Sequence, residues 1–254
     1  GFVHGVMNTD NMSILGLTID YGPFSMMDGY DLEFTPNTTD LPGKRYAFGK
    51  QGQISHWNLA TLANAVFPLI NDAEILEKIL NDYGKRFWIE HDKMLANKFG
   101  FDEVLPEDER FFTEWQQLMQ DFNLDYTLFF QSLEKRDSEI KTDDFSNSFY
   151  RVLNESELKR LSNFIEKYQA RKLKNKISET ESLELMSKTN PKFILRNYLL
   201  FEAIQDAEQD NYERFFELKE ALENPYENRF PQFNQKRPSK YDNQTGCSQL
   251  SCSS

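Results

Sequence analysis

Two carboxylates and a side-chain amide near the start of the chain, Asp10, Asn11 and Asp20, are the residues best suited to chemistry. A hard cation such as Mg²⁺ binds oxygen ligands, and proteins commonly supply one or two of them while substrate phosphates and water supply the rest. Asn11 and Asp20 can supply those two oxygens. Asp10, next to a metal ligand, can accept the proton of an incoming hydroxyl group. Kinase-like enzymes hold metal-bound nucleotide phosphates with such residues, so we predict one base and two metal ligands.

Residues 12–19 lie between the two predicted ligands and must bring them together. This segment is apolar and β-branched, with Gly16 where a tight turn would fall, which favours a short β-hairpin that places Asn11 near Asp20. Asp and Asn are also the commonest turn residues, because their side chains cap their own backbone. Residues 8–11 are therefore also compatible with an ordinary loop.

The pattern departs from the protein-kinase signature at three positions. That signature has His-Arg-Asp with an Asn five residues after the Asp, and Asp-Phe-Gly at the second metal ligand. Here Gly5 occupies the position of the Arg. Asn11 follows Asp10 directly, and Tyr21 takes the place of the Phe. An ordinary protein kinase is therefore disfavoured.

The wider sequence resembles the selenoprotein O family, most densely over residues 2–70 and again near residues 190–200. The resemblance implies a kinase-like (pseudokinase) fold and transfer of AMP from ATP onto Ser, Thr or Tyr hydroxyls of proteins. It also implies that the metal is Mg²⁺ or Mn²⁺, with Asp10 as the base and Asn11 and Asp20 as the ligands. The blocks that carry the resemblance are His4–Ser13, Asp20–Phe24, Met27–Asp31, Arg45–Gly49, Trp57–Leu59 with Leu62–Ala63, and Asn190–Leu199.

The expected fold is mainly α: the large lobe of a kinase-like enzyme with a short β-hairpin at the catalytic loop. The small lobe of such enzymes carries a glycine-rich loop over the phosphates and a Lys held by a Glu. Since no such segment precedes the catalytic loop in this sequence, we expect a C-terminal part of a longer protein, with the N-terminal small lobe missing. We expect residues 1–70 to carry the catalytic loop, residues 71–223 the rest of the large lobe, and residues 224–254 an extended tail.

Hydrophobic periodicity predicts a helical body after the catalytic loop. Trp57 is expected in the core of a helix that ends at Pro68, and Asp72 is expected to cap a second helix that ends near Gly100. Acidic residues 107–109 precede a third helix, where caps and a solvated face explain them more simply than a metal site. Further helices are expected at residues 125–136, 143–153, 155–173, 192–207 and 210–222, with a surface connection at 173–181.

Composition limits the partners of the protein. The net charge is −12, and an acidic surface repels phosphate backbones, so we expect neither nucleic acid nor an anionic membrane surface as a partner. No apolar stretch approaches the length needed to cross a bilayer, so this part is expected to be soluble. The three widely spaced His and two Cys do not form a zinc-binding pattern.

The last residues, 224–254, lose helical periodicity and are rich in Pro, Asn, Gln and Ser, which predicts the extended tail. The tail contains Cys247 and Cys252, whose spacing on a mobile end permits a disulfide or exchange with another thiol. Two cysteines in such a tail can equally be incidental. The resemblance favours a redox role, because family members carry a redox-active Cys or selenocysteine close to the C-terminus, in the place of Cys252.

The sequence therefore predicts a protein adenylyltransferase that uses ATP, a divalent cation and protein substrates, with a redox link through the tail. The chain alone is expected to be inactive without the small lobe. The alternatives are transfer of a phosphoryl group or another nucleotide, and a non-catalytic module that binds partners and senses redox state. Arg196 is expected in an internal salt bridge, with a substrate phosphate as the alternative. The resemblance implies a mitochondrial protein in a eukaryote or a cytoplasmic one in a bacterium, and the substrates and oligomeric state stay open.

Overall fold

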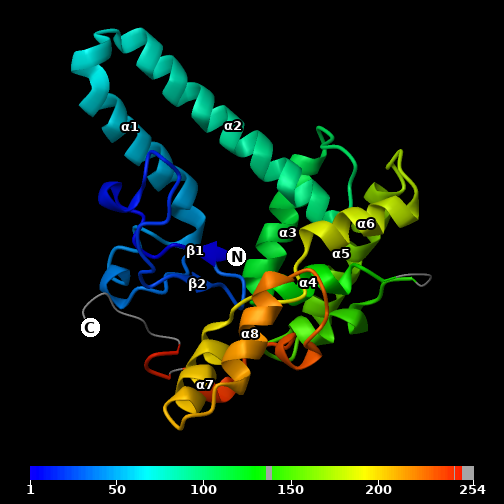
Figure 1. The fold of residues 1–254 in the computed structure, drawn as a ribbon. Coiled ribbons are helices and arrows are strands. Elements are labelled where there is room, and N and C mark those ends of the chain that lie inside the picture. Colours follow the sequence, from blue (N-terminus) through cyan, green and yellow to red (C-terminus); the bar gives the residue numbers. More distant parts are fainter. Residues whose placement is uncertain (136–138, 243, 248–254) are drawn as a thin grey trace. The chain divides into compact units, whose positions relative to one another are not determined.

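The computed structural model describes residues 1–135, 139–242 and 244–247, and it is mainly helical, which confirms the expected fold class at that level (Figure 1). Strands β1 (Phe2–Val3) and β2 (Ser25–Met26) pair in a two-stranded sheet. None of the described helices has the length and apolar character of a membrane span. The α-helices are α1 (Gln51–Ile70), α2 (Ala73–Phe99), α3 (Asp108–Phe122), α4 (Tyr126–Ser132), α5 (Glu155–Lys172), α6 (Glu179–Thr189), α7 (Asn197–Ala207) and α8 (Glu213–Glu223).

The chain divides into two compact units. The first, the helical unit, contains Gly1, Met26–Asp31 and the described residues from Asp92 onward. The second, the N-terminal unit, contains Phe2–Ser25 and Leu32–His91, so the division passes through α2. The predicted base and metal ligands all belong to the N-terminal unit.

Helices α1 and α2 form a helical hairpin. Asn71 adopts the left-handed conformation (φ 51°) that ends α1, and the Asp72 carboxylate caps α2 by accepting a hydrogen bond from the Ile75 amide (3.1 Å), as predicted. The Tyr83 hydroxyl donates to Ser55 Oγ (2.8 Å), which joins the two helices side by side. α1 extends to Ile70, two residues beyond Pro68, where we expected it to end.

The expected core position of Trp57 is wrong, because this side chain is 46% exposed. On α2, Ile75, Ile79 and Trp88 are likewise between 51% and 61% exposed. Helical periodicity identifies the apolar positions of a helix, but it does not show what covers them.

The core of the helical unit is an aromatic cluster around Phe99, at the end of α2. The Phe99 ring lies 5.0 Å from the Phe111 ring and 5.1 Å from the Phe130 ring, both edge to face. Such pairs stabilise a core by about 0.5–1.5 kcal/mol each beyond the burial of their area. The other rings in contact with Phe99 are those of Phe101, Phe112, Trp115, Phe164 and Tyr168.

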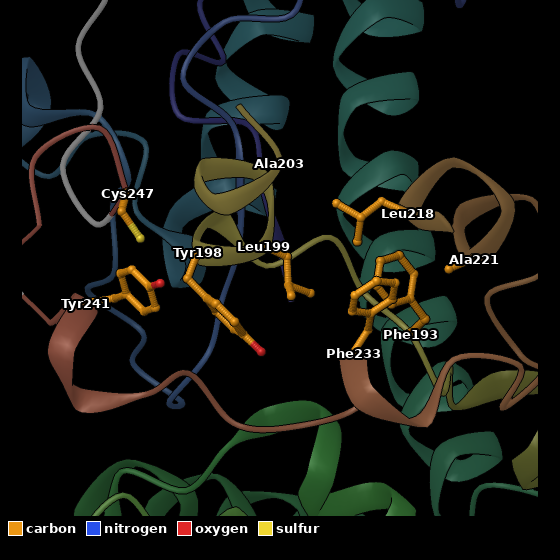
Figure 2. Packing of buried hydrophobic residues seen from close by; sticks show 9 residues of the cluster. All are labelled: Phe193, Tyr198, Leu199, Ala203, Leu218, Ala221, Phe233, Tyr241 and Cys247. Carbon is orange, nitrogen blue, oxygen red and sulfur yellow. The ribbon is translucent and has the colours of Figure 1, made fainter. Parts of the chain in front are cut away.

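A second core joins α7 and α8 to the residues that follow them (Figure 2). Leu199 of α7 and Leu218 of α8 pack with Phe233, Tyr241 and Cys247, all buried. The prediction of an extended tail is therefore wrong for residues 231–242 and 244–247, because the aromatic residues there supply a core that the Pro- and Asn-rich composition concealed. Cys252 lies outside the described residues.

Three other local predictions differ from the structure. Residues 12–19 contain a turn at Gly16 (φ 69°) but no strand, so the predicted hairpin is wrong. α6 occupies part of the stretch that we expected to be a surface connection, and its start has a capping box between Ser178 and Glu181. Asp108 is fully buried rather than on a solvated face, because the Arg171 guanidinium pairs with it.

Candidate functional site

The predicted base and ligands lie on one loop, residues 4–24, which we call the site loop. The β1–β2 pair closes this loop at its two ends. Gly5 has a φ of 80°, and a Cβ atom at this position would lie 2.4 Å from the carbonyl oxygen of Pro23. Both the backbone conformation and the close approach of the two arms require glycine here. The loop is thus closed by the backbone rather than by the predicted hairpin.

A short 3₁₀ turn, η1 (Thr9–Asn11), orients the first ligand. The Asn11 amide nitrogen Nδ2 donates to the carbonyl oxygen of Val6 (3.0 Å). The side-chain nitrogen is therefore used by the backbone, and the oxygen Oδ1 is the atom that Asn11 can offer to a cation. Asp10 belongs to the same turn, and its carboxylate is exposed to solvent.

Asn11 and Asp20 line the same cavity, which has a volume of about 620 Å³. Asp20 is exposed, and its Oδ1 accepts a hydrogen bond from the Tyr21 amide (2.7 Å). The lining contains both predicted ligands, whereas Asp10 is not part of it within the described chain. Large apolar side chains next to Asp20 are exposed, namely Leu17 (64%), Ile19 (59%) and Tyr21 (80%).

Helix α1 anchors the site loop through two polar side chains that the sequence analysis missed. The Gln51 Oε1 atom accepts a hydrogen bond from the His4 backbone amide (3.0 Å), and its Nε2 atom donates one to the carbonyl oxygen of Phe2 (2.9 Å). Asn58 is only 6% exposed, and its Nδ2 donates to the carbonyl of Met7 (3.0 Å). The Asn58 Oδ1 atom is buried without a hydrogen-bond partner in the described structure. An Asn one helical turn after the buried Ile54 was the signal available in the sequence.

Arg196 lies in a buried charge cluster of the helical unit and not in the candidate site. Its guanidinium pairs with Asp28 (2.5 Å) and Asp125 (2.9 Å), so the internal salt bridge expected from the sequence is confirmed. Burial alone would lower the pKa of Arg196, but the charges of Asp125 and Asp28 raise it above its ordinary value. Burial raises the pKa of Tyr150, whose hydroxyl donates to Asp125 (2.8 Å). These groups stabilise the fold.

The predicted redox and metal residues have unequal support. Cys247 is buried in the second core, and burial raises the pKa of its thiol. Among the described residues, no group of three or more His, Cys, Asp or Glu side chains is placed to hold a metal ion. A site of the predicted kind, with one Asn, one Asp and substrate phosphates, does not need such a group.

Comparison with known proteins gives concordant matches. A family model described as "Protein adenylyltransferase SelO" matches residues 1–223. Proteins named "Protein nucleotidyltransferase YdiU" from Cytophaga hutchinsonii and Aromatoleum aromaticum are 41% and 42% identical to the whole chain, which covers 50% and 49% of their lengths. The protein of the same name from Flavobacterium johnsoniae is 40% identical over the whole chain and 50% of its own length. The chain thus spans about half the length of the curated relatives it matches.

Proposed function

The chain belongs to the SelO family of protein nucleotidyltransferases, and from this membership we propose that the protein transfers AMP from ATP to Ser, Thr or Tyr hydroxyls of other proteins. The observation that carries the proposal is the shared cavity of Asn11 and Asp20, with Asp10 one residue away on the same loop. We further propose that the chain forms the kinase-like large lobe. The rest of the nucleotide site would come from the part of the relatives' length that this chain does not span.

The donor set at the cavity fits a hard divalent cation. The amide oxygen of Asn11 and the carboxylate of Asp20 are both oxygen ligands, and phosphate and water oxygens can complete the coordination. Mg²⁺ or Mn²⁺ bound there would neutralise charge on the nucleotide phosphates. Asn11 is preorganised for this role, because its nitrogen is already bound to Val6.

In the proposed reaction, Asp10 accepts the proton of the attacking hydroxyl group. The hydroxyl oxygen forms a bond to the α-phosphorus of ATP as the bond to the β-phosphate oxygen breaks, and pyrophosphate leaves. An exposed carboxylate has access to a hydroxyl on a second protein, which a base buried in the cavity would not have. Holding the reacting groups in place would supply much of the rate acceleration.

The experiment that tests this proposal uses the full-length protein with ATP labelled at the α- or the γ-phosphate. Transfer of α-label to protein supports adenylylation, whereas transfer of γ-label supports the alternative phosphotransferase. Asp20→Ala should abolish transfer and weaken nucleotide binding, and Asp10→Ala should slow transfer without weakening binding. The exposed Asp143 of the helical unit is a matched control, and Asp143→Ala should keep full activity. Equal loss of nucleotide affinity in the Asp10 and Asp20 variants would refute the role of Asp10.

Two further parts of the proposal concern the tail and the compartment. We propose that Cys252 is the redox residue of the tail, because it occupies the place that the family resemblance assigns to such a residue. The competing hypothesis is a non-catalytic redox-sensing module, which has no need of Asp10, Asn11 and Asp20 together. The relatives named above are bacterial, and we therefore propose the cytoplasm as the compartment.

A further inference from the structure

An exposed arginine is stacked on an exposed tryptophan in the N-terminal unit. The Arg45 guanidinium carbon lies 4.5 Å from the centre of the Trp57 ring and 5.8 Å from the centre of the Tyr46 ring. Both side chains are exposed to solvent, and the exposed fraction of Trp57 is 46%. An arginine in solution samples many rotamers, whereas one stacked on an indole is held in a defined orientation.

The backbone that carries Arg45 is built around a buried carboxylate. Asp40 is 9% exposed and accepts hydrogen bonds from the backbone amides of Arg45 (2.8 Å) and Tyr46 (2.9 Å) and from the Thr35 hydroxyl (3.2 Å). Three donors on one carboxylate fix the loop from residue 35 to residue 46. The backbone position from which the Arg45 side chain extends is therefore fixed by the fold.

This loop is joined to the site loop. Asn37 Nδ2 donates to the carbonyl of Gly5 (3.4 Å). Trp57, which supports Arg45, directly precedes Asn58, whose amide bonds to Met7 of the site loop. The loop of residues 35–46 is thus joined to the site loop by the hydrogen bond from Asn37 to Gly5, and α1, which carries Trp57, is joined to it through Asn58, all within the N-terminal unit.

The chemistry of the stacked guanidinium defines its ligand. The indole lies against the guanidinium, and a guanidinium presents its N–H groups as a planar fork that matches a carboxylate or a phosphate. Within the described residues, neither Arg45 nor its neighbour Lys44 forms an ion pair. In a chain with a net charge of −12, two adjacent unpaired cations are a local site for an anion.

We propose that Arg45 binds an anionic side chain of the protein substrate, close in sequence to the hydroxyl that accepts AMP. This inference rests on the proposed function and names its substrate class: proteins with a carboxylate or a phosphorylated residue near the acceptor. Arg45 is a specificity residue, so it acts on substrate binding. The hydroxyl and Asp10 remain the reacting groups.

The test uses the full-length protein, ATP and a peptide library with a central Ser, Thr or Tyr and varied flanking residues. The wild type should prefer Asp or Glu at one flanking position, and Arg45→Gln should raise KM for acidic peptides by about tenfold while kcat stays close to that of the wild type. Arg45→Glu should invert the preference toward Lys and Arg. A separate set of peptides with phosphoserine at the preferred position distinguishes a phosphate from a carboxylate ligand.

Arg110 of α3 provides a matched control, since it is an exposed arginine of the helical unit. Arg110→Glu makes the same change in net charge and should keep the wild-type preference. Suppose that the wild type transfers AMP and that Arg45→Glu keeps the wild-type preference for flanking residues. This result overturns the inference about Arg45 but leaves the proposed function intact. Absence of transfer to any peptide or protein overturns the proposed function, and this inference with it.

Discussion

The buried pair between Arg171 of α5 and Asp108 of α3 allows a quantitative test of how the helical unit is stabilised. The two side chains are 5% and 0% exposed. The guanidinium donates to both carboxylate oxygens, with Nε to Oδ1 at 2.6 Å and Nη2 to Oδ2 at 2.9 Å. Arg171 also lies 4.2 Å from the Phe101 ring centre, and Asp108 accepts the Leu105 amide (2.8 Å). All the main polar atoms of the pair therefore have partners.

Removing either partner leaves an uncompensated buried charge, so the effects of the two removals on the free energy of unfolding should not add. Arg171→Met leaves a buried carboxylate without its counter-charge, and Asp108→Asn leaves a buried guanidinium in the same state. Each loss should lower the free energy of unfolding by about 3–5 kcal/mol. The double variant buries no uncompensated charge, so its loss should be smaller than the sum by at least about 2 kcal/mol.

Urea unfolding followed by the fluorescence of the buried Trp115 measures these losses. The exposed pair between Lys167 and Glu114 joins the same two helices and serves as the control. Its cycle, Lys167→Met with Glu114→Gln, should give a coupling energy below about 1 kcal/mol. Additive losses in the buried pair, or equal couplings in both pairs, would refute the reasoning.

Three other predictions follow from the structure. In the full-length protein, Asn58→Ala should remove the hydrogen bond to Met7 and loosen the site loop. The proposed Mg²⁺-dependent transfer should then weaken by roughly 5- to 150-fold, as 1–3 kcal/mol implies, and titration of transfer against Mg²⁺ measures this. Thiol labelling should modify the buried Cys247 much more slowly than an unfolded reference, and fast labelling in the native state would contradict its place in the second core. Burial lowers the pKa of Lys98 from 10.5 to about 8. Between these pH values the unfolded chain keeps a proton that the folded chain has lost, so the free energy of unfolding should rise with pH. Urea unfolding at pH 7 to 10 should therefore show the stability of Lys98→Met relative to the wild type falling as pH increases.

Local signals in the sequence predicted most of the helices, but the helix expected at residues 143–153 is wrong, because this stretch forms only a 3₁₀ helix at Thr142–Ser148. The cap at Asp72 is present as predicted, because a cap depends on residues within one turn of each other. The start of α5 has a capping box of the same local kind between Asn154 and Glu157. The same kind of signal at Ser178 and Glu181 marked α6 but was overlooked. Trp57 was assigned to the core because periodicity identifies an apolar position without identifying what covers it.

The contacts that shape the candidate site were beyond local reasoning. The sequence supplied Asp10, Asn11 and Asp20 through their chemistry and the family resemblance. It did not supply the bond from Asn58 to Met7, whose partners are 51 residues apart, because no rule of spacing connects a helix side chain to a distant carbonyl. The closure of the site loop was likewise attributed to a hairpin of residues 12–19, whereas the β1–β2 pair and the contact of Gly5 with Pro23 provide it.

The second core also sets an order of events during protein synthesis. The match to the family model covers residues 1–223, yet Phe233, Tyr241 and Cys247 belong to the core around α7 and α8. On the ribosome, about 50 further residues must therefore be synthesised after the start of α7 before that core can be complete. At 5–20 residues per second this takes roughly 3–10 s. Asp28 waits even longer for its partner Arg196, which is 168 residues away. The segment next to the site loop is made early and is fixed in place only late in translation.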